Sequence, residues 1–144
     1  MSSGDDLIPV ATALRAAVGM IKRRARANQT TGLTSPEVAV LSRLDRNGPD
    51  TIAGLARWGQ ITPQAMGATV AGLETRDLVK RSADPADKRR QLLALTQAGV
   101  DQLYGARDEI NRQLAAELAA HFTDGEIAVI RDAAPLIQRL AQYL

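Results

Sequence analysis

The stretch TIAGLARWGQITPQAMGATVAGLETRDLVKRSADPADKRRQLLALT, residues 51–96, decides the fold that this sequence predicts. It opens with a short helix that Thr51 can N-cap, because its hydroxyl can accept an orphan backbone N–H. Gly59 is expected as the turn residue, since glycine takes a positive φ without steric cost. Thr62 and Pro63 then suit the cap and first position of a second helix. Two helices joined by a short glycine-containing turn form the helix-turn-helix plan, whose second helix enters a DNA major groove.

The second half of the stretch is typical of a β-hairpin with a basic loop. Residues 78–81 and 91–95 have the composition of two short strands. Between them an Asp-Pro pair marks a turn, and three consecutive cations, Lys88, Arg89 and Arg90, lie near the hairpin tip. Such a projecting wing can reach DNA phosphates and a minor groove.

Amphipathic helices are predicted on both sides of this lobe, over residues 7–27, 34–47, 96–121 and 123–144. Pro9 is tolerable because it is expected in the first turn of the first helix. The other three helices start at capping residues, which are Thr34 with Glu37, Thr96, and Thr123 with Glu126. Apolar stripes at both ends of the chain favour burial against a second copy, and packing within one chain is the alternative.

Composition limits the class of protein. A chain of 144 residues fits one domain with a sizeable core. No run approaches a membrane span and the start has no signal-peptide pattern, so we expect a cytoplasmic protein with no membrane partner. Cysteine is absent, which excludes disulfides and Cys-type zinc sites, and no metal or cofactor is expected.

Charge is unevenly placed along the chain. Residues 1–96 carry 14 Lys/Arg and 9 Asp/Glu, a net of +5, whereas residues 97–144 carry 4 and 7, a net of −3. A basic first part suits a DNA-facing end, and chance unevenness of solvated charges is the alternative.

Three segments resemble the MarR-type winged-helix regulators: LARWGQITPQAM (55–66), LETRDLVKR (73–81) and DPADKRRQLLALTQAG (84–99), of which the last is the most specific. The resemblance implies a mainly α fold with a small β-hairpin wing. It places a winged helix-turn-helix lobe at about 34–96 and dimerisation helices at about 5–28 and 97–144, all within one domain, 1–144. Asp77 stands where this family usually carries glycine, and aspartate tolerates the left-handed conformation better than most residues.

The resemblance also implies function. We expect a homodimeric transcriptional regulator that binds double-stranded DNA at a near-palindromic operator. A repressor is expected, and an activator, which would use the same DNA contacts, is the alternative. Relatives often lose DNA affinity when a small, often aromatic and acidic, ligand binds where the dimerisation helices meet the DNA-binding lobe. Arg15, Arg23, Trp58 and His121 could line such a pocket. For Trp58 the alternative is a packing role, and for His121 it is a structural one.

The recognition helix is unusual because residues 62–73 contain no charged side chain, whereas many relatives carry Arg or Lys at Ala68 and Gly72. Glutamine can pair with adenine and small apolar groups can touch a thymine methyl, so we expect an A·T-leaning operator. An ordinary polar helix face is the alternative for Gln64 and Thr69. The residues expected to face the major groove are Thr62, Pro63, Gln64, Ala65, Ala68 and Thr69.

In the wing, likeness to the family makes Asp87 and Arg89 the signature pair. Arg89 would enter the minor groove, where narrow A·T tracts attract arginine, and Asp87 would orient it. Lys88 and Arg90 complete the basic cluster, and a solvated hairpin tip is the alternative. Weaker candidates, for phosphate contacts, are Arg57, Arg76, Lys80 and Arg81.

Two other classes of protein compete with a DNA-binding regulator. An enzyme is disfavoured, because one histidine, no cysteine and no glycine-rich phosphate loop leave little chemistry. The stronger rival is a winged-helix module that binds protein and has lost specific DNA binding. The uncharged recognition helix supports that rival, and the basic wing opposes it.

Overall fold

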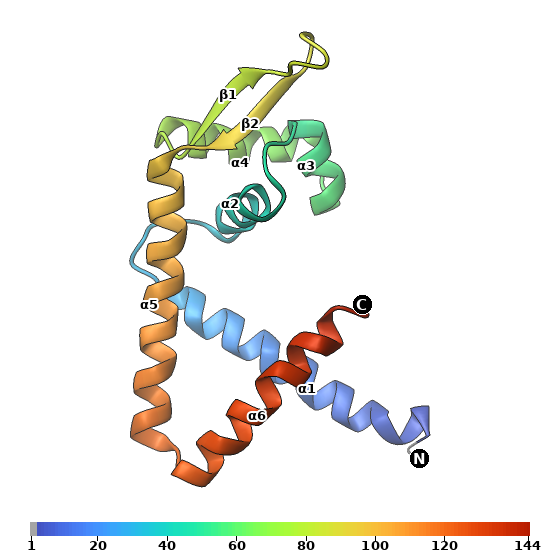
Figure 1. The fold of residues 1–144 in the computed structure, drawn as a ribbon, viewed down its shortest axis with the longest axis vertical. Coiled ribbons are helices and arrows are strands. Elements are labelled where there is room, and N and C mark those ends of the chain that lie inside the picture. The colour runs from blue at the N-terminus through green and yellow to red at the C-terminus, as the bar shows by residue number, and fades with distance from the viewer. Residues whose placement is uncertain (1–2) are drawn as a thin grey trace. The chain divides into compact units, whose positions relative to one another are not determined.

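Helices dominate the fold, and a two-stranded hairpin interrupts them (Figure 1). The computed structural model describes residues 3–144. Its elements are α1 (Gly4–Ala27), α2 (Ser35–Asn47), α3 (Ile52–Gly59), α4 (Pro63–Thr75), β1 (Val79–Ala83), β2 (Gln91–Leu95), α5 (Gln97–His121) and α6 (Asp124–Ala141). The predicted class, mainly α with a β-hairpin wing, is therefore confirmed. The chain divides into two compact units, of which the first ends at Arg107 and the second starts at Asp108.

The first unit contains a lobe built from α2, α3, α4 and the hairpin. Within it α4 contacts both other helices and β1, while α2 also contacts β2 (Figure 1). These contacts enclose a core of aliphatic side chains from every one of these elements and from α5. Its fully buried members include Val40, Leu41, Leu55, Val70, Leu73, Leu93 and Leu103.

Side-chain caps start most of the helices, as the sequence predicts. The Thr34 hydroxyl accepts the Glu37 N–H at 3.3 Å, and the Glu37 carboxylate accepts the Thr34 N–H at 2.9 Å. Thr123 and Glu126 repeat this reciprocal pair at 3.2 and 2.9 Å. Single hydroxyl caps join Thr51 to Gly54, Thr62 to Ala65 and Thr96 to Gly99, at 3.0–3.1 Å. Each cap satisfies an N–H that the helix itself leaves free.

The turn between α3 and α4 differs from the prediction. Gln60, not Gly59, takes the left-handed conformation, with φ 54° and ψ 39°. The helix continues through Gly59, and the Gln60 N–H closes it on the carbonyls of Ala56 and Arg57. A Cβ on Gly59 would meet the end of the Met66 side chain at 3.4 Å, which is ordinary van der Waals contact.

Pro9 is also placed differently. The helix starts at Gly4, with the Asp6 carboxylate accepting the Ser3 N–H at 3.3 Å, so Pro9 lies in the second turn and not the first. Its missing N–H removes the helical bond to the Asp5 carbonyl. A second proline, Pro135, lies inside α6.

The hairpin has a third backbone partner. β1 and β2 pair antiparallel from Val79↔Leu95 to Ala83↔Gln91, so the first strand begins one residue later and ends two residues later than predicted. Asp50 extends this pairing through reciprocal backbone bonds with Leu93, of 3.1 and 2.7 Å. The bridge holds the residue that precedes Thr51, and with it the start of α3, beside β2.

The connections at either end of the hairpin are tight. Asp77 takes the left-handed conformation as predicted, with φ 56°. The Thr96 hydroxyl donates to the Asp77 carbonyl at 2.6 Å, which ties the end of β2 to the start of β1. Gly99 then packs so closely against the Leu78 carbonyl that a Cβ would lie 2.1 Å from its oxygen. The start of α5 is thereby fixed to the lobe.

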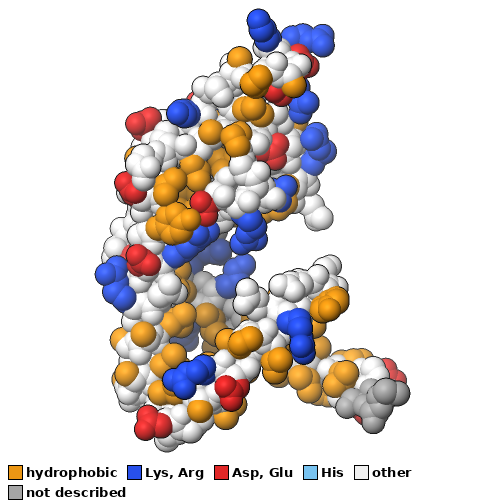
Figure 2. Space-filling model, viewed as in Figure 1, with side chains coloured by type: hydrophobic (Ala, Val, Ile, Leu, Met, Phe, Trp, Pro, Cys, Tyr) orange, Lys and Arg blue, Asp and Glu red, His pale blue; other side chains and the backbone are white. Residues whose placement is uncertain are grey.

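The two terminal helices differ from the lobe in burial. Neither α1 nor α6 contains a buried residue, and large apolar side chains of each lie open to solvent (Figure 2). Among the described residues, no helix has the length and hydropathy needed to cross a membrane.

Candidate nucleic-acid interface

The exposed face of α4 is small and uncharged. The helix buries Met66, Val70 and Leu73 in the lobe core. Its outward residues are Thr62, Pro63, Gln64, Ala65 and Ala68, all exposed, with Thr69 half-buried. The Thr69 hydroxyl donates to the Ala65 carbonyl at 3.4 Å within the helix. This surface offers one amide, two hydroxyls and several methyl groups.

Gly72 does not share this outward face. A Cβ built on it would meet the Glu37 carboxylate at 3.0 Å, so this position faces the start of α2. The same carboxylate pairs with the Arg76 guanidinium at 3.5 Å. An arginine in place of Gly72 would therefore point toward α2. Of positions 68 and 72, only position 68 lies on the outward face, and there this chain carries alanine and no cation.

Aspartates shape the wing tip. The Asp84 carboxylate accepts the Ala86 N–H at 2.9 Å, and the Asp87 carboxylate accepts the Arg89 N–H at 3.1 Å. The backbone closes the loop with bonds from Arg90 to Asp87 and from Asp84 to Arg90, of 2.9 and 3.0 Å. These bonds make the tip a defined turn and not a loose chain.

Arg89 projects from this turn with its side chain 93% exposed, and its Nε lies 3.3 Å from the Asp87 carboxylate. One carboxylate oxygen thus holds both the backbone and the guanidinium of Arg89. Lys88 and Arg90 make no side-chain hydrogen bond or ion pair within residues 3–144, and both are exposed. Basic side chains gather at the end of the hairpin, as Figure 2 shows.

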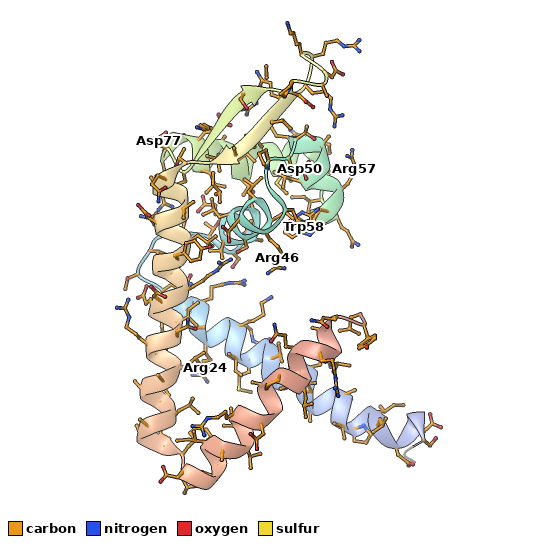
Figure 3. The ribbon with its side chains drawn as sticks, in the orientation of Figure 1. Arg24, Arg46, Asp50, Arg57, Trp58 and Asp77 are labelled. Atoms are coloured by element: carbon orange, nitrogen blue, oxygen red, sulfur yellow. The ribbon has the colours of Figure 1, made fainter. Side chains whose placement is uncertain are left out.

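The four weaker candidates separate into two kinds. Arg76 bonds the Thr31 and Gly32 carbonyls at 3.1 and 3.2 Å besides its pairing with α2, so it clamps the loop before α2. Arg81 pairs with Glu74 at 2.7 Å. Arg57 projects outward from α3 (Figure 3), and neither Arg57 nor Lys80 has a side-chain partner in the described part of the chain. Arg76 and Arg81 therefore stabilise the lobe through contacts within the chain, whereas the side chains of Arg57 and Lys80 make no such contact.

Two further clusters join residues that are far apart in the sequence, and no local signal predicts them. Trp58 lies on the surface, 43% exposed, with the Arg43 guanidinium 5.5 Å from its ring centroid (Figure 3). Trp58 therefore packs against the Arg43 guanidinium on the surface and is not part of the core. On the other side of α2, Asp45 accepts from Tyr104 and from Arg107, each at 3.3 Å.

His121 belongs to the second unit, where it lies 3.3 Å from the Glu117 carboxylate one helical turn earlier. The contact joins two exposed side chains of the same helix and leaves the role of His121 a prediction.

Comparison with known proteins identifies the family. Residues 31–90 match the family model described as MarR family. The HTH-type transcriptional regulator Mb0904 of Mycobacterium bovis is 27% identical over 132 residues, 91% of this chain and 92% of that one. A crystal structure from Pseudomonas aeruginosa, of a protein assigned to the transcriptional regulators, is 31% identical, with a TM-score of 0.80 over 98% of this chain and 99% of that one.

The fold is also that of a mutant of MepR from Staphylococcus aureus, in a structure with an oligodeoxyribonucleotide bound. The two share 20% identity and a TM-score of 0.67, over 94% of this chain and 98% of that one. The proteins of this family act on transcription and are not enzymes. The family model covers the helix-turn-helix and most of the basic wing, residues 31–90. The chain belongs to the MarR family of winged-helix transcriptional regulators.

Proposed function

We propose that this regulator binds double-stranded DNA through α4 and the wing, as a homodimer on a near-palindromic operator, and represses transcription. The observation that carries the proposal is that one lobe presents both an exposed α4 face and an exposed basic wing. The oligodeoxyribonucleotide bound to the MepR mutant, which shares this fold, adds support. Arg89 would enter a minor groove, and Lys88 and Arg90 would contact the backbone beside it.

Exposed apolar surface supports the homodimer. In α1, Leu7, Ile8 and Val10 are 49–62% exposed, and in α6, Leu136 and Leu140 are 55% and 47% exposed. Complete burial of such a side chain is worth about 1.5–3 kcal/mol, and because these are already half buried, each would contribute roughly half of that on association. Two recognition helices would then enter major grooves about one turn, roughly 10 base pairs, apart.

The chemistry of α4 supports an A·T-leaning operator. Gln64 is the outward residue able to form two hydrogen bonds with one base, and adenine is the base that matches an amide. Ala65 and Ala68 present methyl groups suited to thymine. A selection from random duplexes should therefore return an A·T-rich core, and a G·C-rich core would overturn this part of the proposal.

Regulation would act on the spacing of the two DNA-binding lobes in the dimer. A small aromatic or acidic ligand would release DNA by favouring a dimer whose two lobes have the wrong spacing. The protein would act in the cytoplasm, where its DNA target would lie.

The deciding experiment is fluorescence anisotropy of the protein with DNA from its own upstream region, at two salt concentrations. Wild type should bind tightly and salt-sensitively, and Arg89→Ala should weaken binding because it removes the exposed wing cation. Arg46→Ala is the matched control, since Arg46 is an exposed arginine of α2 that points away from the hairpin (Figure 3).

Equal losses for both variants would mean that overall charge, and not the wing, drives binding. Absence of binding to this DNA and to random duplexes, with the dimer intact, would favour the alternative function. In that case the lobe is a protein-interaction module.

A further inference from the structure

Arg81 connects the wing to the recognition helix α4. It lies on β1 opposite Leu93 of β2, two residues after the buried Val79. Because side chains two residues apart on a strand share one face of the sheet, Arg81 extends from the face that packs on the lobe core. Lys80, between them, lies on the opposite face. The alternation of β1 thus directs Arg81 toward α4 and Lys80 away from it.

The Arg81 guanidinium is bonded through all three of its nitrogens. Its Nε and one Nη donate to a single carboxylate oxygen of Glu74, in the last turn of α4, at 2.8 and 2.7 Å. Its other Nη donates to the side-chain oxygen of Gln91, on β2, at 3.3 Å. Bonds from a planar guanidinium to a carboxylate fix direction as well as distance. We call Glu74, Arg81 and Gln91 the wing brace, because together they join α4 to both strands of the hairpin.

The wing brace lies at the outer limit of the contacts between the hairpin and α4. Nearer the core, Val79 and Leu93 are buried and hold the base of the hairpin. Beyond Arg81 the remaining residues of β1 are exposed, and the loop lies at the end of the hairpin remote from α4 (Figure 1). In the described part of the chain, no other side-chain hydrogen bond or ion pair joins α4 to the hairpin.

We propose that Glu74 and Arg81 are positioning residues for DNA recognition. The wing brace holds the hairpin at the angle to α4 at which α4 can occupy a major groove while Arg89 enters the minor groove beside it, so the inference rests on the proposed function. A wing oriented before binding loses less conformational freedom when the complex forms. Glu74 would therefore raise the affinity for DNA, although its own charge repels phosphate.

The sharpest test is the sign of the effect of Glu74→Gln on DNA affinity, measured by fluorescence anisotropy. Electrostatics alone predicts tighter binding, because the substitution removes a negative charge from a protein that binds a polyanion. The wing brace predicts binding weaker by about two- to tenfold, the range for one lost hydrogen bond to a charged group at a partly exposed site. Asp101→Asn is the matched control. It removes the same charge from α5, where the carboxylate accepts from Gln97 of the same helix, and should not weaken binding.

A double-mutant cycle with Arg89→Ala separates positioning from general stability. In Arg89→Ala the wing has lost the contact that the brace positions, so Glu74→Gln should cost less there than in wild type. An equal cost in both backgrounds would show that Glu74 acts through α4 or through stability, and would overturn the proposal.

The third measurement needs no DNA. NMR relaxation of the backbone amides reports the mobility of the wing on the picosecond to nanosecond scale. Order parameters of the wing should fall in Glu74→Gln and keep their wild-type values in Asp101→Asn, and unchanged values in Glu74→Gln would overturn the brace. Absence of DNA binding by wild type would refute the proposed function. Binding by wild type that Glu74→Gln leaves equal or tighter would overturn this inference alone.

Discussion

Replacing glycine by alanine at position 99 and at position 105, both in α5, should have opposite effects on stability. A Cβ at Gly99 would lie 2.1 Å from the Leu78 carbonyl oxygen, 3.0 Å from its carbon and 3.3 Å from the Leu95 side chain. A Cβ at Gly105, further along the same helix, would meet nothing within 4 Å. Helix propensity alone predicts that alanine stabilises both positions, by about 0.5–1 kcal/mol.

The contact at Gly99 outweighs that gain. To restore van der Waals separation, the start of α5 must move by about 1 Å away from the lobe. That movement strains the bond from the Thr96 N–H to the Leu78 carbonyl, now 3.1 Å, whose net worth is about 1 kcal/mol. Forcing an extra methyl into a packed site costs about 1–3 kcal/mol. Gly99→Ala should therefore lose about 1–3 kcal/mol net, whereas Gly105→Ala should gain up to about 1 kcal/mol.

Thermal unfolding followed by circular dichroism measures both variants against wild type. For a chain of this size each kcal/mol corresponds to roughly 2–5 °C in Tm. Protein concentration must be equal in all samples, because association shifts apparent stability by mass action. Shifts of the same sign for the two variants would refute the reasoning, since they would show that propensity, and not the close approach to Leu78, governs α5.

Three further outcomes are expected. Gln60→Gly should raise stability by up to about 1 kcal/mol in urea unfolding, because glycine takes φ 54° without strain, and a loss would mean that the Gln60 side chain makes contacts of its own. Arg76→Ala should cost about 1–2 kcal/mol, since it leaves two loop carbonyls without this donor and removes the cation beside the Glu37 carboxylate, and an unchanged midpoint would show that water replaces it. Leu140→Glu should convert a dimer to monomer by light scattering, with Arg139→Glu on the same helix as control, and a dimer surviving both would exclude this stretch of α6 from the interface.

Local signals in the sequence predict the helices and the wing. The Thr34–Glu37 and Thr123–Glu126 boxes are each complete within one helical turn, so their geometry needs no tertiary contact. The Asp87–Arg89 pair is likewise formed within one turn of the chain. For the same reason the left-handed conformation of Asp77 is predictable, because the turn demands it whatever packs around it.

Prediction fails at the exact end of a helix and where residues distant in sequence decide the outcome. The assignment of the left-handed turn to Gly59 is wrong by one residue, because α3 continues through Gly59 and Gln60 closes it in the left-handed conformation. Arg76 stays a predicted phosphate contact, and only the fold shows that it also donates to loop carbonyls 44 and 45 residues away. A positive charge in the sequence does not show whether the fold has already used it.

The sequence by itself therefore determined the order of elements, the caps that start them and the wing with its signature pair, since each depends on residues within a few positions of one another. Only the tertiary structure decided which arginines remain free and that Asp50 joins the hairpin beside Leu93. That bridge holds the start of α3 beside β2. Its physical reason is backbone hydrogen bonding between distant segments, which any residue except proline can supply and which therefore leaves no mark on side-chain identity.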